Sequence, residues 1–193
     1  MRDKTRQYGA LDEIRRDHVL RYRFAASRIQ KGAEVLDIAC GCGYGSKILH
    51  DARLKITGID ISQDAIEYAA KNYPGPCYLQ AKAEDLGDLS FDAVVSFETL
   101  EHLKEPERLL AKTKTDLLIA SVPNEEKYPF WADRFAGDEY PHQRHYTPAQ
   151  FHELLDNANY SVLEWFTQKD KKGDITPGMD GLFLIAICGP GSI

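Results

Sequence analysis

The sequence predicts an α/β fold of the doubly wound type, in which helices cover both faces of a mostly parallel sheet. Short apolar segments typical of buried strands alternate with helical segments up to Val122. The first of these strands ends in a cluster of glycines, as in sheets that bind a ligand at their carboxyl edge. The chain has 193 residues, 43% of them hydrophobic and 28% charged, which suits one domain with an ordinary core. We therefore expect a single domain over residues 1–193 and seven strands.

The N-terminal segment predicts a helix at about residues 11–29. From Ile14 to Ala25, apolar residues recur on one face at helical spacing, and neither proline nor glycine interrupts the segment. Gly32 ends this pattern. A short apolar segment then predicts the first strand at residues 35–39, directly before the glycines.

The other elements follow from the same alternation and from residues that start helices. Ser62 has an acid in the turn that follows it, and Thr147 precedes Pro148, so both predict helix N-termini. Pro106 is expected to start the second part of a helical segment. The expected strands are 54–61, 77–81, 91–97, 117–122, 160–168 and 181–188, and the expected helices are 46–51, 62–72, 98–114 and 147–158.

Two segments lack a regular pattern. Residues 123–146 form a long polar and aromatic segment, and loops of that length in a compact domain usually bind or cover a ligand. We expect this loop to cover the substrate. Residues 169–180 are charged and are expected to be a plain connection between the last two strands.

Charge and composition limit the partners. With 24 basic and 30 acidic residues the formal net charge is −6, which does not favour binding to long nucleic acid. The four cysteines do not have the spacing of a disulfide scaffold or a zinc site. No secretory signal and no membrane span are expected, so we expect a cytoplasmic location. The sequence does not indicate the oligomeric state.

The glycine loop and two acids predict a nucleoside-binding site. The pattern Gly41-x-Gly43-x-Gly45 follows the first strand and lets the backbone approach a ligand closely. Asp60 ends the second strand, 19 residues after Gly41, where a carboxylate can accept the hydroxyls of an adenosine ribose. A dinucleotide site uses similar parts, but its third glycine comes one residue later. Asp37, within the first strand, is placed where a cationic amino-acid ligand would need a carboxylate.

Four segments together resemble the motifs of class I S-adenosylmethionine-dependent methyltransferases. They occur in the family's order at residues 35–46, 58–62, 83–86 and 91–103. The resemblance implies a Rossmann-like sheet whose last strand is antiparallel. When the opening segment at residues 18–26 is included, the sequence is similar to small-molecule methyltransferases of polysaccharide pathways. One departure is visible, because the usual glycine pair before the fifth strand is missing and Lys112 to Asp116 lead directly into Leu117.

The resemblance implies S-adenosyl-L-methionine as the cofactor and assigns contacts to it. The methionine end would be held by Asp37 and by the backbone around Ala39, Gly41 and Gly43. Asp60 would bind the ribose, and Ile61 would flank the adenine. Glu84 and Asp85 would meet the adenine edge, while Ser96 and Phe97 would line the sulfonium side. Arg21 either reaches the cofactor carboxylate or is a solvated arginine.

The histidines near the expected acceptor site allow three interpretations. His102 and His145 are the candidates for a catalytic base. His102 is expected at the carboxyl edge of the sheet, and His145 is expected in the long loop. Alternatively, the histidines shape the pocket through bonds to the backbone. A third interpretation is a metal site of Glu98, Glu101 and His102 with His142 or His145, similar to that of small-RNA terminal ribose methyltransferases. We expect no metal here.

We expect the protein to transfer a methyl group to a small-molecule or sugar acceptor. An oxygen atom is favoured over a nitrogen atom as the atom that is methylated. The aromatic residues 128–131, with Phe135 and Tyr140, would cover the acceptor or fill a small core of their own. The alternatives are a nucleic-acid or nucleotide-modifying methyltransferase and a non-catalytic cofactor-binding protein. A nicotinamide oxidoreductase is disfavoured by the glycine spacing.

Overall fold

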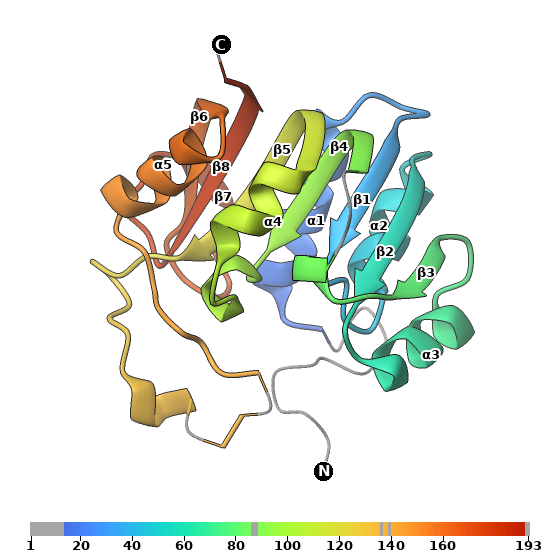
Figure 1. Cartoon of the computed structure of the whole chain (residues 1–193), viewed down its shortest axis with the longest axis horizontal. Helices are drawn as coiled ribbons and strands as arrows, with labels where there is room; N and C mark the ends of the chain where they lie inside the picture. Colours follow the sequence, from blue (N-terminus) through green and yellow to red (C-terminus); the bar gives the residue numbers. More distant parts are fainter. Residues whose placement is uncertain (1–13, 86–88, 136, 139, 192–193) are drawn as a thin grey trace.

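One eight-stranded sheet runs through the part of the chain that the computed structural model describes, residues 14–191 without 86–88, 136 and 139. The strand order is β3-β2-β1-β4-β5-β8-β6-β7 (Figure 1). Strands β1 to β5 pair in parallel, whereas β8 is antiparallel to β5 and β6, and β7 is antiparallel to β6. The strands are β1 (Glu34–Ile38), β2 (Lys55–Asp60), β3 (Cys77–Gln80), β4 (Leu89–Phe97), β5 (Thr113–Pro123), β6 (Tyr160–Gln168), β7 (Ile175–Pro177) and β8 (Phe183–Pro190).

The doubly wound class and the antiparallel last strand are confirmed, but the sheet has one strand more than expected. The additional strand, β7, lies within residues 169–180, which the sequence predicted to be a plain connection. It has three residues and pairs with the end of β6, from Phe166 to Gln168. Charged neighbours on both sides conceal so short a strand in a sequence pattern.

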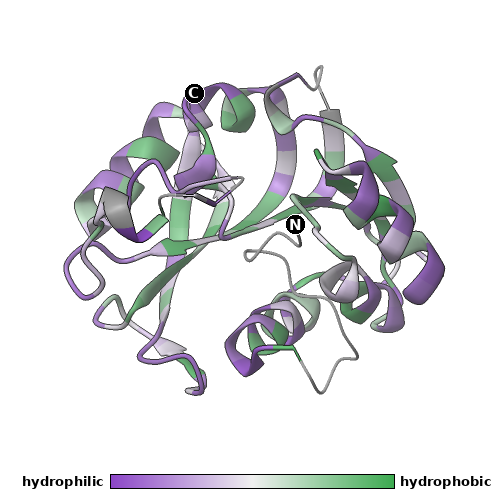
Figure 2. Cartoon of the chain, turned by 90° about the horizontal axis from the view of Figure 1, so that it is seen from below, coloured by the Kyte–Doolittle hydropathy of each residue, from purple (hydrophilic) through white to green (hydrophobic). Residues whose placement is uncertain are grey.

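Helices cover both faces of this sheet (Figures 1 and 2). On one face, Tyr22 and Leu49 of the first two helices share a core with Val95 of β4. On the other face, Leu109 and Phe151 of the last two helices share a core with alternate strand residues. The helices are α1 (Arg16–Arg28), α2 (Tyr44–Asp51), α3 (Gln63–Asn72), α4 (Pro106–Lys112) and α5 (Pro148–Asn157), with 3-10 turns η1 (Ala83–Asp85), η2 (Leu100–His102) and η3 (Ala132–Phe135).

Two helix starts that the sequence predicted from capping residues are confirmed. The Ser62 side chain accepts the backbone N–H of Ala65, and Thr147 forms a reciprocal capping box with Gln150. The helix expected at 98–114 is instead the turn η2 followed by α4, which ends at Lys112. The part of the N-terminal helix expected at residues 11–13 lies outside the described residues.

The fifth strand starts earlier than the sequence predicted, at residue 113 rather than 117. Its first residues pair with Leu89, Ser90 and Phe91 of β4. Both strands are longer at this end because they pair with each other. The missing glycine pair is consistent with this, because α4 leads into β5 with no turn between them. None of the helices in the described chain has the length and apolar character needed to cross a bilayer.

The segment expected at residues 123–146 is a loop whose two ends meet beside the sheet. Asn124 and Tyr146 form a parallel bridge, and the N–H of Glu125 donates to the Tyr146 carbonyl at 2.9 Å. The Asn124 amide also donates to the Gly181 carbonyl at 2.9 Å, which ties the loop to the chain just before β8. The loop is thereby held at the carboxyl edge of the sheet.

Candidate active site

A cavity of about 880 Å³ lies at the carboxyl ends of β1, β2 and β4. The strand order reverses between β1 and β4, and this is where doubly wound sheets bind their ligands. Of the residues that the sequence assigned to cofactor binding or to catalysis, seven line this cavity: Arg21, Ala39, Gly41, Asp60, Ile61, Phe97 and His102.

The glycine loop and Asp60 form one hydrogen-bonded unit at the mouth of β1 and β2. Asp60 Oδ2 accepts the N–H of Gly41 at 2.9 Å, and Oδ1 accepts the N–H of Ser62 at 2.9 Å. Gly43 has a φ of +85°, and a Cβ there would lie 2.5 Å from the Cβ of Ala69. Glycine is therefore required both by the backbone conformation and by the close approach of α3.

Asp37 is fully buried behind the glycine loop and does not line the cavity. Its Oδ1 accepts the Tyr22 hydroxyl at 3.1 Å and its Oδ2 accepts the Ser46 hydroxyl at 2.6 Å. Burial raises the pKa of Asp37 to about 7, and the two hydrogen bonds oppose this rise. In the structure, Asp37 connects α1 and α2 beneath the loop.

Arg21 lies in the buried interior, so the interpretation as a solvated arginine is wrong. Its side chain is 1% exposed, and Nη1 donates to Glu98 Oε1 at 2.7 Å and to the Ser121 hydroxyl at 3.3 Å. Nη2 donates to Asp17 at 3.3 Å, and the guanidinium lies 4.5 Å from the centre of the Phe183 ring. The guanidinium is paired with two acids, and Arg21 is one of the residues that line the cavity.

The remaining cofactor contacts expected from the sequence divide into two groups. Ala39, Ile61 and Phe97 line the cavity. The Ile61 side chain is 40% exposed, so it offers an apolar surface on which a flat ligand can pack. Three others do not line it, because Gly43 faces α3, Ser96 is buried in β4 and Asp85 is exposed on η1. The side chain of Glu84 lies outside the described part of the chain.

Three histidines connect η2 with the long loop. His102 Nδ1 lies 2.9 Å from the Tyr140 carbonyl oxygen, and His142 Nδ1 lies 2.9 Å from His145 Nε2. His145 Nδ1 bonds the Tyr128 carbonyl oxygen, so both its ring nitrogens have partners. His102 and His142 line the cavity, whereas His145 is buried behind His142.

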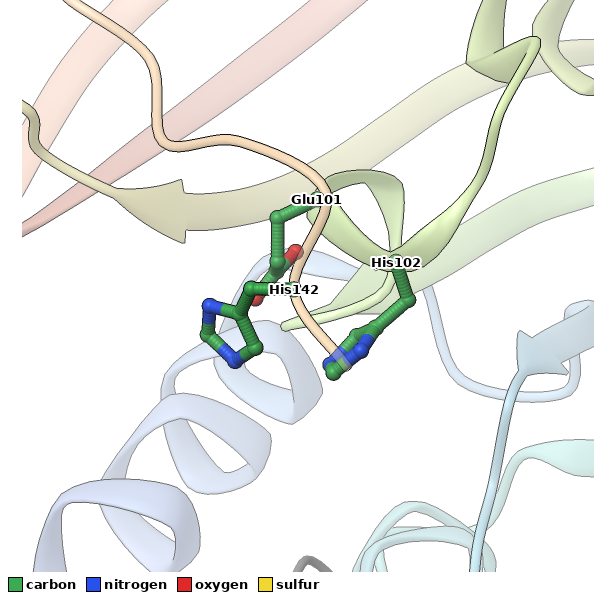
Figure 3. A group of neighbouring side chains, drawn as sticks. All are labelled: Glu101, His102 and His142. Carbon is green, nitrogen blue, oxygen red and sulfur yellow. The ribbon is translucent and has the colours of Figure 1, made fainter. Parts of the chain in front are cut away.

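The surroundings of His142 favour its neutral form. Burial, followed by the neighbouring rings of His102 and His145, lowers the pKa of His142 to about 3. Glu101 lies next to these histidines (Figure 3) and is fully buried. Burial, and then the carboxylate of Glu98, raise the pKa of Glu101 well above its usual value.

Sequence reasoning missed several residues of the cavity wall. His18 and Tyr22 were expected only as part of the apolar face of α1, and Lys171 only as part of a charged connection. His18 Nδ1 lies 2.9 Å from the Tyr44 hydroxyl, and burial lowers the pKa of His18. No local sequence signal distinguishes such residues from ordinary helix and loop positions.

The central part of the chain matches a known family. Residues 36–117 match the family described as "Methyltransferase domain". This segment contains the glycine loop, Asp60 and the end of β4, which line one side of the cavity.

Curated relatives carry related names. A probable S-adenosylmethionine-dependent methyltransferase of Mycolicibacterium smegmatis is 27% identical over 154 residues, which cover 76% of this chain and 59% of the relative. A ubiquinone biosynthesis O-methyltransferase of Glaesserella parasuis is 32% identical over 94 residues, covering 43% of this chain and 40% of the relative. The chain thus spans between 40% and 59% of the length of these two relatives.

A solved structure shares the fold. The S-adenosylmethionine-dependent methyltransferase of Thermotoga maritima described as a possible histamine N-methyltransferase superimposes with a TM-score of 0.71 and is 20% identical. The superposition covers 90% of each chain. Motif order, sheet topology and these comparisons agree: residues 36–117 match a methyltransferase domain, and the chain is similar to class I S-adenosylmethionine-dependent methyltransferases.

Proposed function

We propose that this chain binds S-adenosyl-L-methionine in the cavity and transfers its methyl group to an oxygen atom of a small molecule or sugar. The observation that carries the proposal is Asp60, whose carboxylate lies at the cavity and is fixed by the Gly41 N–H at 2.9 Å. A carboxylate at the end of the second strand, beside bare glycine backbone, suits the two hydroxyls of an adenosine ribose.

The rest of the cofactor would follow the cavity wall from Asp60. Ile61 would pack on the adenine, and the backbone at Ala39 and Gly41 would approach the methionine end. Phe97 would line the sulfonium side. Asp37 would support this arrangement from behind, because its hydrogen bonds hold Tyr22 rather than an exposed ligand.

The acceptor would lie against the long loop. Tyr128, Phe135 and Tyr140 line the cavity there and offer flat apolar surfaces to a ring. An oxygen acceptor is supported by the O-methyltransferase names among the curated relatives. Partners expected from the net charge of −6 are small molecules rather than long nucleic acid.

In the proposed reaction, the acceptor oxygen forms a bond to the methyl carbon while the carbon–sulfur bond breaks and its electron pair returns to sulfur. The hydroxyl proton passes to a base, either His102 or a water molecule. Holding the two reactants in line supplies about 7–11 kcal/mol of such a barrier, whereas a general base adds about 10²–10⁴-fold. Of the two histidines considered as bases, His102 lines the cavity and His145 does not.

Calorimetry with S-adenosyl-L-methionine tests the cofactor assignment. Asp60→Ala should weaken binding at least tenfold, because the ribose hydroxyls lose their acceptor and the loop loses its anchor. The matched control is Asp64→Ala, an exposed acid on α3, which should bind like the wild type. Unchanged affinity in Asp60→Ala, or tighter binding of NAD than of the sulfonium compound, would overturn the proposal.

A screen with methyl-labelled cofactor tests the acceptor. Phenols, catechols and sugars should accept label, and amines should accept less. Cofactor binding without transfer to any acceptor would instead favour a non-catalytic binding protein.

A further inference from the structure

Glu101 is a buried carboxyl group without a hydrogen-bond partner among the described residues. It is 0% exposed, and neither Oε1 nor Oε2 has a partner there. Leaving a buried polar group unpaired costs about 1–3 kcal/mol, and more if the group is charged. Most buried polar side chains are accordingly paired. An unpaired carboxyl group at this position indicates that the protein binds a ligand there.

Two imidazoles lie beside this carboxyl group. Ligand atoms of Glu101, His102 and His142 all lie within 4.8 Å of one another. Figure 3 shows Glu101 and His102 on the short helical turn η2, with His142 approaching from a separate segment, the long loop. Two imidazoles and one carboxylate form a ligand set that zinc and iron(II) ions use in proteins.

Hydrogen bonds determine which nitrogen of each ring carries the proton. A carbonyl oxygen only accepts, so His102 donates from Nδ1 to Tyr140. By the same reasoning, His145 donates from Nδ1 to Tyr128, which leaves the lone pair on Nε2. That lone pair accepts a hydrogen bond from the His142 Nδ1–H, with 2.9 Å between the two nitrogens. In the neutral rings of His102 and His142, the lone pair therefore lies on Nε2.

We infer that Glu101, His102 and His142 bind one divalent first-row transition-metal ion at the acceptor side of the cavity. Histidines that bind metals commonly donate their other N–H to a carbonyl or another fixed group, as both of these do. Ligands about 2.0–2.2 Å from an ion lie about 3–3.5 Å from one another, so the three side chains draw together on binding. His145 is then a positioning residue that acts through His142.

The inference departs from the sequence-based expectation of no metal, and it deepens the proposed function. Three protein ligands leave at least one coordination position, and His102 and His142 both line the cavity. An acceptor hydroxyl bound at that position would have a lowered pKa and would release its proton to solvent. His102 would then be a ligand rather than a base. This role rests on the proposed function, whereas binding of the ion does not.

Titration of chelator-treated full-length protein with Co²⁺, followed by visible absorption and calorimetry, tests the site without any turnover. One equivalent should bind, and Zn²⁺ should displace it. Glu101→Gln and His142→Gln should each lose at least tenfold in Co²⁺ affinity. His145→Gln should lose about 10–100-fold, as substitutions of outer-shell partners do. The matched control His152→Gln, at an exposed position of α5, should bind normally.

Thermal unfolding in chelator separates ligand loss from misfolding. Glu101→Gln should unfold at the same temperature as the wild type or higher, because it removes an unpaired buried acid. If Glu101→Gln does not fold, the Co²⁺ affinity of His142→Gln, at the cavity wall, tests the inference instead. Absence of one-to-one Co²⁺ binding, or full affinity in a folded ligand variant, would overturn the inference. Calorimetry with S-adenosyl-L-methionine on the same metal-free samples shows separately whether the cofactor assignment holds.

Discussion

Asp37 illustrates how a single buried carboxyl group can organise a binding loop without touching the ligand. It accepts hydrogen bonds from Tyr22 of α1 and Ser46 of α2, so it joins two helices below the glycines. Burial nevertheless disfavours its charge, and Asp60 nearby adds to this effect. The folded protein therefore holds a carboxyl group that titrates close to neutral pH.

Replacing Asp37 with Asn should change how stability depends on pH. The pKa of Asp37 in the folded state is about 7, above the value near 3.9 in an unfolded chain. Its contribution to stability is therefore complete below about pH 4 and is lost as the pH rises through about 7, on the order of 4 kcal/mol at most. Urea unfolding at several pH values measures this, and Asp37→Asn should lack that loss. Parallel pH profiles of the two proteins would contradict the raised pKa.

At the scale of residues, the sequence identified positions that belong to motifs and missed contacts between distant segments. Asp60 and Gly41 were assigned from their spacing, and the structure places them in direct contact. Arg21 could not be placed, because its partner Glu98 is 77 positions away and no local pattern links them. Glu98 has a φ of +51°, a conformation that sequence patterns do not reveal in a non-glycine residue.

The first two helices pack so closely that one of them needs a glycine. A Cβ on Gly45 of α2 would lie 2.0 Å from the Tyr22 ring of α1. That ring also meets Phe97 edge to face, with centroids 5.1 Å apart, and its hydroxyl bonds Asp37. The position of α1 over the cavity therefore depends on the missing side chain.

Gly45→Ala should destabilise the protein by about 1–3 kcal/mol, as overpacking in a rigid core does. The Tyr22 ring must move, and its hydrogen bond to Asp37 is then lost. Urea unfolding measures the effect. In the Tyr22→Leu background, where the smaller side chain leaves room, the same Gly45→Ala change should cost much less. An equal cost in both backgrounds would show that the clash with Tyr22 is not the cause.

At the scale of elements, the sequence predicted those with strong local signals. The caps at Ser62 and Thr147 define helix starts by hydrogen bonds within a few residues, so their patterns are visible. The first residues of β5 and the short strand β7 are strands because a neighbouring strand pairs with them. Pairing of that kind depends on tertiary structure, and a periodicity argument cannot detect it.

For the whole molecule, the cavity is assembled from segments that are far apart in the chain. The glycine loop and the end of β2 supply one wall, and these were predicted from motifs. The other wall combines His18 from α1, His142 from the long loop and Lys171 from the connection before β7. Residues of the second kind come together only when the sheet brings its carboxyl edge, the loop and α1 to one place.

Arg21 connects these parts, and a double-mutant cycle with Glu98 tests how far the fold depends on it. Arg21→Met removes the cation beside Glu98, while Asp17 keeps its pair with Arg15, and breaking a buried pair in this way costs about 3–5 kcal/mol. Adding Glu98→Gln should recover part of that loss, because the charge of the carboxylate that lost its pair with Arg21 is removed. Chemical unfolding of the wild type, both single variants and the double variant gives the coupling energy. If Arg21 instead serves mainly a cofactor carboxylate, Arg21→Met will weaken S-adenosyl-L-methionine binding while the unfolding free energy stays close to that of the wild type and the cycle shows no coupling.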